Sequence, residues 1–448
     1  MKTKTFFIAS LGCAKNTVDS DSMANLLAIN GYQAVGKPSD AEILIVNTCG
    51  FIKPARDEAI EVLQELASGK RQKQRLIAAG CLPQRNMQLI LDHVHGIDGI
   101  LGTRNWVDIV DLVEHLRNEQ NYGKPQINLP DNAHLVVQHD QVGRFTIQGG
   151  SAYVKIADGC RRPCAFCAIP LIKGTAVSRP VSAIIQEISQ LASAGIQEIN
   201  LIAQDSTDYG SDLGMKDGLP DLLTEIISNV PTLPWIRIMY AFPGSVSDRL
   251  IDLLARNSQI LPYLDIPLQH AHPDVLKRMR RPANMDWVYK TIAKMRQAMP
   301  KLAIRSTFIV GYPGETEQEF ETLLEFLSEI KLNHVGVFPF SFEPGTASEM
   351  LGDPIPQELK DERIQRLMTL QEQISLELNL KYVGKVQDVL IEGYDKGIAI
   401  GRAYHDAPEI DGLVLIQEFP KRSVPQIGTI VKARITGALA HDLFAQPA

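Results

Sequence analysis

Three cysteines lie close together near the middle of the sequence, where they could bind a metal cluster. Cys160, Cys164 and Cys167, called the central triad below, are separated by three and then by two intervening residues. Three thiolates at this spacing can hold one corner of a 4Fe–4S cluster, whose fourth iron would have no protein ligand and could bind a small molecule. Structural zinc sites usually combine a Cys-x2-Cys pair with a second pair or with histidines, and no such pair follows here. The spacing therefore favours an iron–sulfur cluster.

The N-terminal part of the chain has the pattern of a parallel α/β sheet, in which short apolar runs alternate with helical patterns such as Ala55–Leu66. The predicted strands are Thr5–Ser10, Glu42–Asn47 and Arg75–Ala79. Cys13, Cys49 and Cys81, called the N-terminal triad below, each follow one of these strands by two or three residues. Because the carboxyl ends of parallel strands share one edge of a sheet, where ligands bind, we expect these cysteines to meet.

An alternative for the N-terminal triad is three unrelated buried thiols, each acting as a small hydrophobic side chain. However, each cysteine is flanked by a glycine, which favours exposed turns over core positions. These glycines are Gly12, Gly50 and Gly80. With a second cluster here, all six cysteines of the chain are accounted for as two sets of three. We therefore expect a second three-cysteine cluster site.

The middle of the chain is predicted to be an incomplete barrel of six βα units. It follows a linker over residues 121–150 that is rich in Gly, Pro, Asn and Gln and could contain a hairpin. Six apolar runs then alternate with helical patterns such as Val181–Ala194 and Glu317–Ile330. The predicted strands are Ala152–Ala157, Glu198–Ala203, Trp235–Tyr240, Tyr263–Leu268, Ala303–Val310 and His334–Phe340. Active sites of such barrels lie at the carboxyl ends of the strands, and Cys160 follows the first strand.

The C-terminal part is predicted to be a small all-β barrel. Pro356–Val383 is expected to form a charged helical connector. From Gly384 the pattern changes to short alternating strands separated by Gly-rich turns. The predicted strands are Val386–Glu392, Gly397–Arg402, Gly412–Ile416 and Thr429–Ile435. The expected fold is thus an N-terminal parallel α/β sheet domain, a central partial (βα)6 barrel and a C-terminal β-barrel.

The composition is ordinary for a soluble globular protein, with 45% hydrophobic and 22% charged residues. A net charge of −7 argues against a general nucleic-acid binder and is compatible with a basic partner. Six cysteines in 448 residues, in motif-like spacings, suit a reducing cytoplasm better than a disulfide scaffold. The apolar run Thr5–Leu11 is short and lacks a cleavage pattern, so we predict a strand there and not a signal peptide. The sequence predicts no membrane span.

Several motifs resemble those of the methylthiotransferases of the radical S-adenosylmethionine (SAM) superfamily. They are the segment Ser10–Asn16, the two later cysteines of the N-terminal triad and the central Cys-x3-Cys-x2-Cys loop. Asp265–His270 and Gly401–Gly412 resemble the branch that modifies an aspartate of the twelfth small-subunit ribosomal protein. The resemblance covers essentially the whole chain. It implies an N-terminal methylthiotransferase domain over residues 1–120, a radical SAM core over 145–378 and a TRAM domain over 380–448.

The resemblance also implies the chemistry. The cluster on the central triad would bind and reduce SAM, giving a radical that removes hydrogen from the β-carbon of the substrate aspartate. The cluster on the N-terminal triad would hold or donate the sulfur, and a second SAM would supply the methyl group. The protein would therefore contain two 4Fe–4S clusters, and would need an external electron donor and a sulfur donor.

Four further residues are candidates for binding SAM. Phe166 matches an aromatic residue that packs on adenine in the superfamily, although a phenylalanine could equally fill the barrel mouth. Gln204 and Asp205 follow the second barrel strand, where relatives place polar contacts to SAM. Arg305, on the fifth strand, could face the carboxylate of SAM, and its alternative is a structural salt bridge.

Competing functions are a tRNA methylthiotransferase with the same chemistry, a two-cluster electron carrier and a zinc-binding module. An electron carrier needs neither a βα barrel nor an added β-domain, so the domain content argues against that function. The C-terminal barrel, residues 384–448, has seven Lys or Arg and eight Asp or Glu, a net charge of −1. An RNA-binding barrel should be clearly basic, so nucleic acid is an unlikely substrate. We expect Asp406, Glu409 and Asp411 to dock a basic ribosomal protein.

Overall fold

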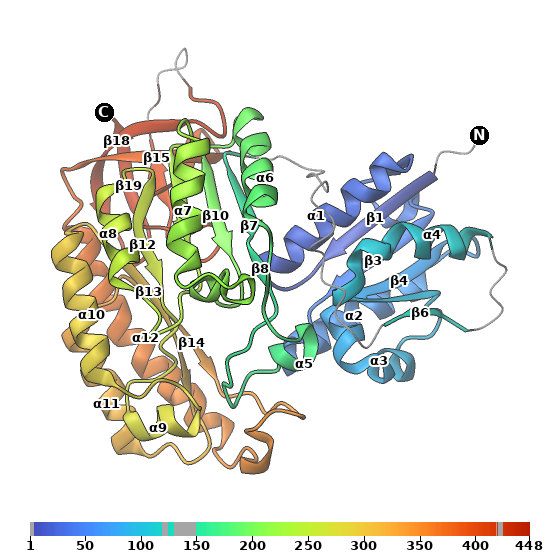
Figure 1. Cartoon of the computed structure of the whole chain (residues 1–448), viewed down its shortest axis with the longest axis horizontal. Helices are drawn as coiled ribbons and strands as arrows, with labels where there is room; N and C mark the ends of the chain where they lie inside the picture. The colour runs from blue at the N-terminus through green and yellow to red at the C-terminus, as the bar shows by residue number, and fades with distance from the viewer. Residues whose placement is uncertain (1–3, 119–123, 130–148, 418, 420–423) are drawn as a thin grey trace. The chain divides into compact units, whose positions relative to one another are not determined.

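The computed structural model describes residues 4–118, 124–129, 149–417, 419 and 424–448 (Figure 1). Contacts between residues divide the chain into two compact units. The first unit comprises residues 1–146, 157–183 and 341–349, and the second comprises 147–156, 184–340 and 350–448. All six cysteines therefore belong to the first unit. The division into three domains stays a prediction.

The first unit contains a six-stranded parallel sheet in the order β2-β1-β3-β4-β5-β6. The strands are β1 (Lys4–Ser10), β2 (Tyr32–Ala34), β3 (Ile43–Thr48), β4 (Arg75–Gly80), β5 (Gly99–Gly102) and β6 (Gln126–Asn128). The three predicted strands are confirmed as β1, β3 and β4. The additional strands have only three or four residues, too few to show a period in the sequence. The hairpin expected within 121–150 lies mostly outside the described residues, and β6 pairs in parallel with β5.

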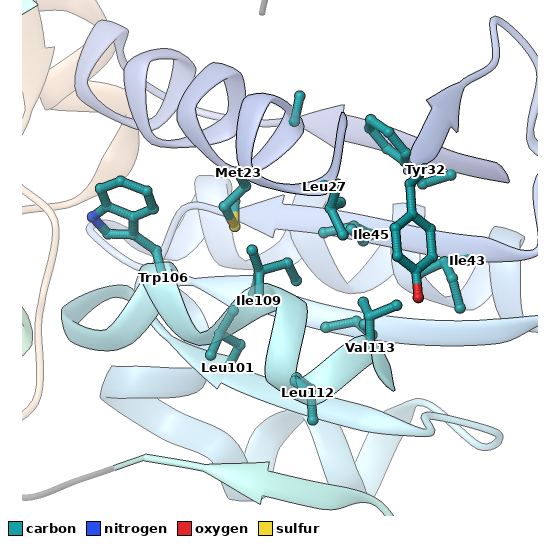
Figure 2. Close-up of a cluster of buried hydrophobic side chains, with 14 of the residues drawn as sticks. Met23, Leu27, Tyr32, Ile43, Ile45, Leu101, Trp106, Ile109, Leu112 and Val113 are labelled. Carbon is teal, nitrogen blue, oxygen red and sulfur yellow. The ribbon is translucent and has the colours of Figure 1, made fainter. Parts of the chain in front are cut away.

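Helices cover both faces of this sheet, which explains why its inner strands β3 and β4 are mostly apolar. The helices are α1 (Ala14–Ile29), α2 (Lys53–Gly69), α3 (Cys81–His93) and α4 (Ile109–Asn118), with the 3-10 helices η1 (Pro38–Asp40) and η2 (Thr103–Asp108). On β3, Ile43 and Ile45 pack with residues of α1 and α4 (Figure 2). The alternate residues Leu44 and Val46 pack with residues of α2 and α3. The first unit also contains β8 (Ala157–Asp158), α5 (Ile169–Lys173) and β9 (Val177–Ser178).

The second unit contains an open parallel sheet in the order β14-β13-β12-β11-β10-β7. Its strands are β7 (Ser151–Lys155), β10 (Glu198–Ile202), β11 (Trp235–Ile238), β12 (Ile260–Asp265), β13 (Ala303–Val310) and β14 (His334–Pro339). The intervening helices are α6 (Val181–Ser193), α7 (Gly218–Asn229), α8 (Asp248–Arg256), α9 (Pro273–Arg278), α10 (Met285–Ala298) and α11 (Glu317–Ile330), with 3-10 helices η3 (Ser206–Asp208) and η4 (Ser211–Leu213). The partial barrel of six βα units is confirmed.

A closed five-stranded barrel, in the order β15-β16-β17-β19-β18, ends the second unit. It follows η5 (Glu349–Leu351) and the connecting helix α12 (Gln357–Leu380). Its strands are β15 (Val386–Asp395), β16 (Ile398–Ala403), β17 (Val414–Ile416), β18 (Ile430–Ala438) and β19 (Leu443–Pro447). The predicted barrel is confirmed, but its last strand was missed, and β19 closes the barrel between β17 and β18. Among the described residues, no helix has the length and apolar character to cross a membrane.

Buried ion pairs join this barrel to the parallel sheet of the second unit. Glu198 on β10 lies 2.8 Å from the guanidinium of Arg237 on β11 and also pairs with Arg402 on β16. All three side chains are at most 1% exposed. Burial opposes ionisation of Glu198, but the two guanidinium groups outweigh it and lower its pKa to about 2. Arg402 also donates to the carbonyl oxygen of Asp406 at 2.8 Å, which fixes the loop after β16.

Candidate functional site

The N-terminal triad lies at one edge of the first sheet, as the sequence predicts. Cys13 separates β1 from α1, Cys49 directly follows β3, and Cys81 begins α3 directly after β4. These strands are neighbours and parallel, so the three loops leave the sheet side by side. A Cβ atom on Gly12, whose φ is +93°, would lie 2.8 Å from Cβ of Cys49. A Cβ on Gly50 would lie equally close, at 2.8 Å, to the carbonyl carbon of Cys81. The glycines thus allow the loops to approach one another.

One buried asparagine connects the three loops. The Asn16 amide donates to the carbonyl oxygens of Leu11 at 3.0 Å and of Thr48 at 3.1 Å, which precede the loops of Cys13 and Cys49. Its side-chain oxygen accepts a hydrogen bond from Sγ of Cys81 at 3.6 Å. The sequence marks Asn16 only as part of a motif. Its role could not be deduced, because its partners come from three separate segments.

The three thiols differ in their exposure. Cys13 is exposed, Cys49 is partly buried and Cys81 is buried. The flanking glycines predicted exposed turns, which is correct for Cys13 but wrong for Cys81, whose loop is covered by neighbouring segments. Burial raises the pKa of Cys49, and it raises the pKa of Cys81 to about 12. A metal that binds these thiols must therefore displace protons. Three converging thiols from rigid strand ends are a donor set that fits an iron–sulfur cluster.

The central triad lies in a single loop between β8 and α5, also in the first unit. The backbone N–H of Cys160 donates to the carbonyl oxygen of Gly174 at 3.0 Å, which closes the loop. The N–H of Arg162 donates to Sγ of Cys160 at 3.4 Å, and the N–H of Cys167 donates to the carbonyl of Cys164 at 3.2 Å. All three cysteines are partly exposed. The loop thus places three partly exposed cysteines together, and Phe166 lies in it, also partly exposed.

The two cysteine sites touch within the first unit. Cys81 of the N-terminal triad packs with Ala168 and Ile172, which follow the central triad, and with Phe51. Arg104 on η2 donates from Nε to the carbonyl oxygen of Ile172 at 2.9 Å and so holds α5 against η2. The sequence predicts two sites but does not predict that they are neighbours.

A buried glutamate from a distant segment supports the loop of Cys49. Glu343 is 2% exposed, lies 2.7 Å from Nη1 of Arg85, and also pairs with Arg56. Arg85 donates in turn to the carbonyl oxygens of Gly50 and Phe51, both at 2.8 Å. In the same segment, the N–H of Ser348 donates to the carbonyl oxygen of Ala165 in the central loop at 2.8 Å. Sequence reasoning missed Glu343, because more than 250 residues separate it from its partners.

The other predicted SAM-binding residues belong to the second unit. Gln204 and Asp205 follow the end of β10 after one intervening residue, and a carboxylate oxygen of Asp205 caps η3 by accepting from the N–H of Thr207 at 3.0 Å. Arg305 donates from Nε to the carboxylate of Asp411 at 3.2 Å and lies 3.9 Å from that of Asp265. Arg305 thus forms a structural salt bridge, which the sequence offered as the alternative to binding the carboxylate of SAM. The roles of all four candidates toward SAM stay predictions.

The predicted acidic docking surface on the C-terminal barrel is wrong for two of its three residues. Asp406 and the side chain of Asp411 are buried, whereas Glu409 is exposed. Asp411 accepts a hydrogen bond from the hydroxyl of Tyr263 at 2.7 Å as well as from Arg305. The loop after β16 turns toward the parallel sheet, so these carboxylates neutralise buried groups and do not face a partner. Formal charge alone could not reveal this.

Comparisons with known proteins agree with the architecture. Residues 154–327 match the radical SAM superfamily, residues 383–447 match the TRAM domain, and residues 5–102 match the uncharacterized protein family UPF0004. A ribosomal protein uS12 methylthiotransferase RimO from Chloroflexus aurantiacus is 46% identical over 98% of this chain and 99% of its own length. A RimO from a Thermoanaerobacter species is 42% identical over 99% of this chain and 100% of its own length.

A solved structure also resembles this chain. It is the radical SAM methyltransferase TsrM from Kitasatospora setae, with cobalamin and a [4Fe-4S] cluster bound. The TM-score is 0.57 and the sequence identity is 13%, with 88% of this chain and 82% of that chain covered. At this identity the likeness concerns the fold alone.

Proposed function

This chain belongs to the ribosomal protein uS12 methylthiotransferase RimO family, and we propose that it holds two 4Fe–4S clusters and modifies the β-carbon of an aspartate in that ribosomal protein. It is a methylthiotransferase with a radical SAM domain, and radical SAM enzymes use one 4Fe–4S cluster and SAM. The second cluster, the aspartate and the cytoplasmic location are our proposals. An external electron donor and a sulfur donor complete the set of partners.

One observation supports the second cluster above all: three loops that are far apart in the sequence bring Cys13, Cys49 and Cys81 to one edge of a sheet. Three unrelated core thiols would not need glycines at the contact points or a shared asparagine. Cys160, Cys164 and Cys167 would hold the cluster that supplies the electron for cleavage of SAM, and Cys13, Cys49 and Cys81 would hold the cluster that carries the sulfur.

The protein's own residues would position and shield these reactants. Cys81 is buried and Cys13 is exposed, so a reactant can approach the N-terminal site on the Cys13 side. The central loop is fixed by its bonds to Gly174 and Ser348, which keep its three sulfurs in place. Such fixed placement lets a short-lived radical meet its target before it meets water.

The substrate is better explained as a basic protein than as tRNA. The C-terminal barrel has a net charge of −1, whereas phosphate recognition draws most of its affinity from Lys and Arg. A ribosomal protein is rich in these residues, and a weakly acidic barrel does not repel it.

The cluster assignment is tested by two triple variants in anaerobically reconstituted protein. C160A/C164A/C167A should lose about half of the roughly eight irons and all reductive SAM cleavage. C13A/C49A/C81A should also lose about half of the iron, keep SAM cleavage and lose sulfur insertion. Deoxyadenosine production by the first variant would exclude the central triad as the radical site. Methylthiolation at a normal rate by the second would show that these thiols are structural.

The substrate is tested by mass spectrometry of ribosomal proteins from cells that lack this chain. We expect uS12 to lack its methylthio group and to regain it when the wild-type gene is restored. Unmodified tRNA together with normally modified uS12 would instead support the tRNA-modifying alternative.

A further inference from the structure

A fully buried lysine lies between the two cysteine sites. Lys173 ends α5 and its side chain is 4% exposed. Its ammonium nitrogen lies 3.1 Å from a carboxylate oxygen of Asp158 and 3.4 Å from one of Asp19, both within hydrogen-bond distance. Asp19 is almost as buried, with 3% of its side chain exposed. A buried ammonium is costly unless it is paired in this way, so the lysine holds both carboxylates firmly.

The partners of Lys173 come from both cysteine sites. Asp158 lies two residues before Cys160 at the start of the central loop, and Lys173 itself closes that loop on the other side. Asp19 lies on α1, the helix that begins directly after Cys13. The ion pairs therefore link the backbone of the central loop to the helix of the N-terminal site.

Lys173 also belongs to the helix that packs against the most buried cysteine. The preceding turn of α5 packs on Cys81 through Ala168 and Ile172. Burial raises the pKa of Cys81, and the positive charge of Lys173 acts in the opposite direction. Water and salt ions screen a charge in this position only weakly.

We propose that Lys173 positions the central loop against the N-terminal site and raises the reduction potential of a cluster bound by the N-terminal triad. This inference rests on the proposed second cluster. A cluster held by three thiolates carries a net negative charge, which increases by one when an external donor reduces it. A nearby fixed cation stabilises the reduced form more than the oxidised form, and net charge is one of the factors that set cluster potentials.

The test uses the substitutions K173Q and K173R, with K360Q as a matched control. Lys360 is equally buried, at 1% exposure, and pairs with Asp353 at 2.6 Å, but it lies in the second unit. Each substitution is made in the C160A/C164A/C167A chain, so that only the N-terminal cluster titrates. Iron is counted, and the cluster is titrated with dithionite while its reduced signal is followed by electron paramagnetic resonance.

We expect K173Q to keep about four irons. At a fixed potential its ratio of reduced to oxidised cluster should fall about tenfold, which corresponds to about 59 mV for one electron. K173R should restore the potential, because it keeps the charge, and K360Q should leave it unchanged. In the chain with both clusters, the magnetic interaction between them should weaken in K173Q.

Three results would contradict these expectations. An unchanged potential in K173Q with its iron retained would overturn the role of Lys173 while leaving the second cluster intact. Equal shifts in K173Q and K360Q would show a general effect of losing a buried charge. Absence of iron in the C160A/C164A/C167A chain would overturn the second cluster and this inference with it. If K173Q does not fold, D19N/K173Q removes one opposite charge together with the lysine and should lower the same ratio by less than about tenfold, because the lost carboxylate offsets part of the lost positive charge.

Discussion

The two cysteine sites of this protein are built in opposite ways. The central triad comes from one loop of eight residues, whereas the N-terminal triad comes from three loops that are 36 and 32 residues apart. The first can form wherever that loop closes. The second exists only when β1, β3 and β4 are paired and the residues between their loops are in place. The N-terminal site should therefore be the more sensitive of the two to changes outside its cysteines.

The largest effect is expected from Glu343→Gln. Arg56 and Arg85 would then lie buried without their counter-charge, at a cost of about 3 kcal/mol. Because Arg85 holds the carbonyls after Cys49, we expect loss of iron from the N-terminal site with SAM cleavage retained. The matched control is Glu349→Gln in the same segment, where the glutamate is exposed. Iron analysis and urea denaturation would show the difference, and equal behaviour of the two variants would contradict it.

Asn16→Ala should come next. It leaves the buried carbonyl oxygen of Thr48 and the partly buried one of Leu11 without their donor, at a cost of about 2 kcal/mol. Asn30→Ala is the control, since Asn30 caps the same helix but bonds only locally, to the carbonyl of Leu26 at 2.8 Å. Iron content should fall only in the first variant. If Asn16→Ala instead lowered the iron of the central site, the two sites would be less independent than the structure indicates.

Two glycines give a matched pair, one at each site. Gly12→Ala would place its Cβ against Cys49. Gly159→Ala would place its Cβ 2.1 Å from the carbonyl oxygen of Thr175. Both glycines have a positive φ, which an alanine adopts only with strain. We expect each substitution to cost about 1–3 kcal/mol and to reduce iron only at its own site. Gly31→Ala has a similar φ but meets nothing within 4 Å, so it measures the backbone strain alone. Electron paramagnetic resonance of each variant would assign the lost cluster.

The smallest effect is the pH dependence of the N-terminal site. The raised pKa values of Cys49 and Cys81 mean that both thiols are protonated in the empty site at neutral pH. Cluster binding releases these protons, so each unit of falling pH should weaken loading by about 1.4 kcal/mol per thiol. Iron uptake by C160A/C164A/C167A, measured between about pH 9 and about pH 6, should therefore fall steadily as the pH falls. Uptake that does not change with pH would contradict this expectation.

The sequence was sufficient wherever a pattern is local. The Cys-x3-Cys-x2-Cys loop and the inner strands of both sheets follow from neighbouring residues. It was insufficient wherever partners are distant. Asn16 and Glu343 gain their roles only from the folded chain. Asp406 and Asp411 have the same formal charge whether their side chains face solvent or the protein interior.

The ion pairs of Glu198 have a consequence for how the protein can be divided. Its partners Arg237 and Arg402 come from the parallel sheet and from the C-terminal barrel. A chain shortened at residue 383 would lose Arg402 and leave Glu198 with one guanidinium partner at a newly opened surface. The barrel therefore should not be removable without destabilising the sheet. The sheet and the barrel should unfold together in one cooperative thermal transition.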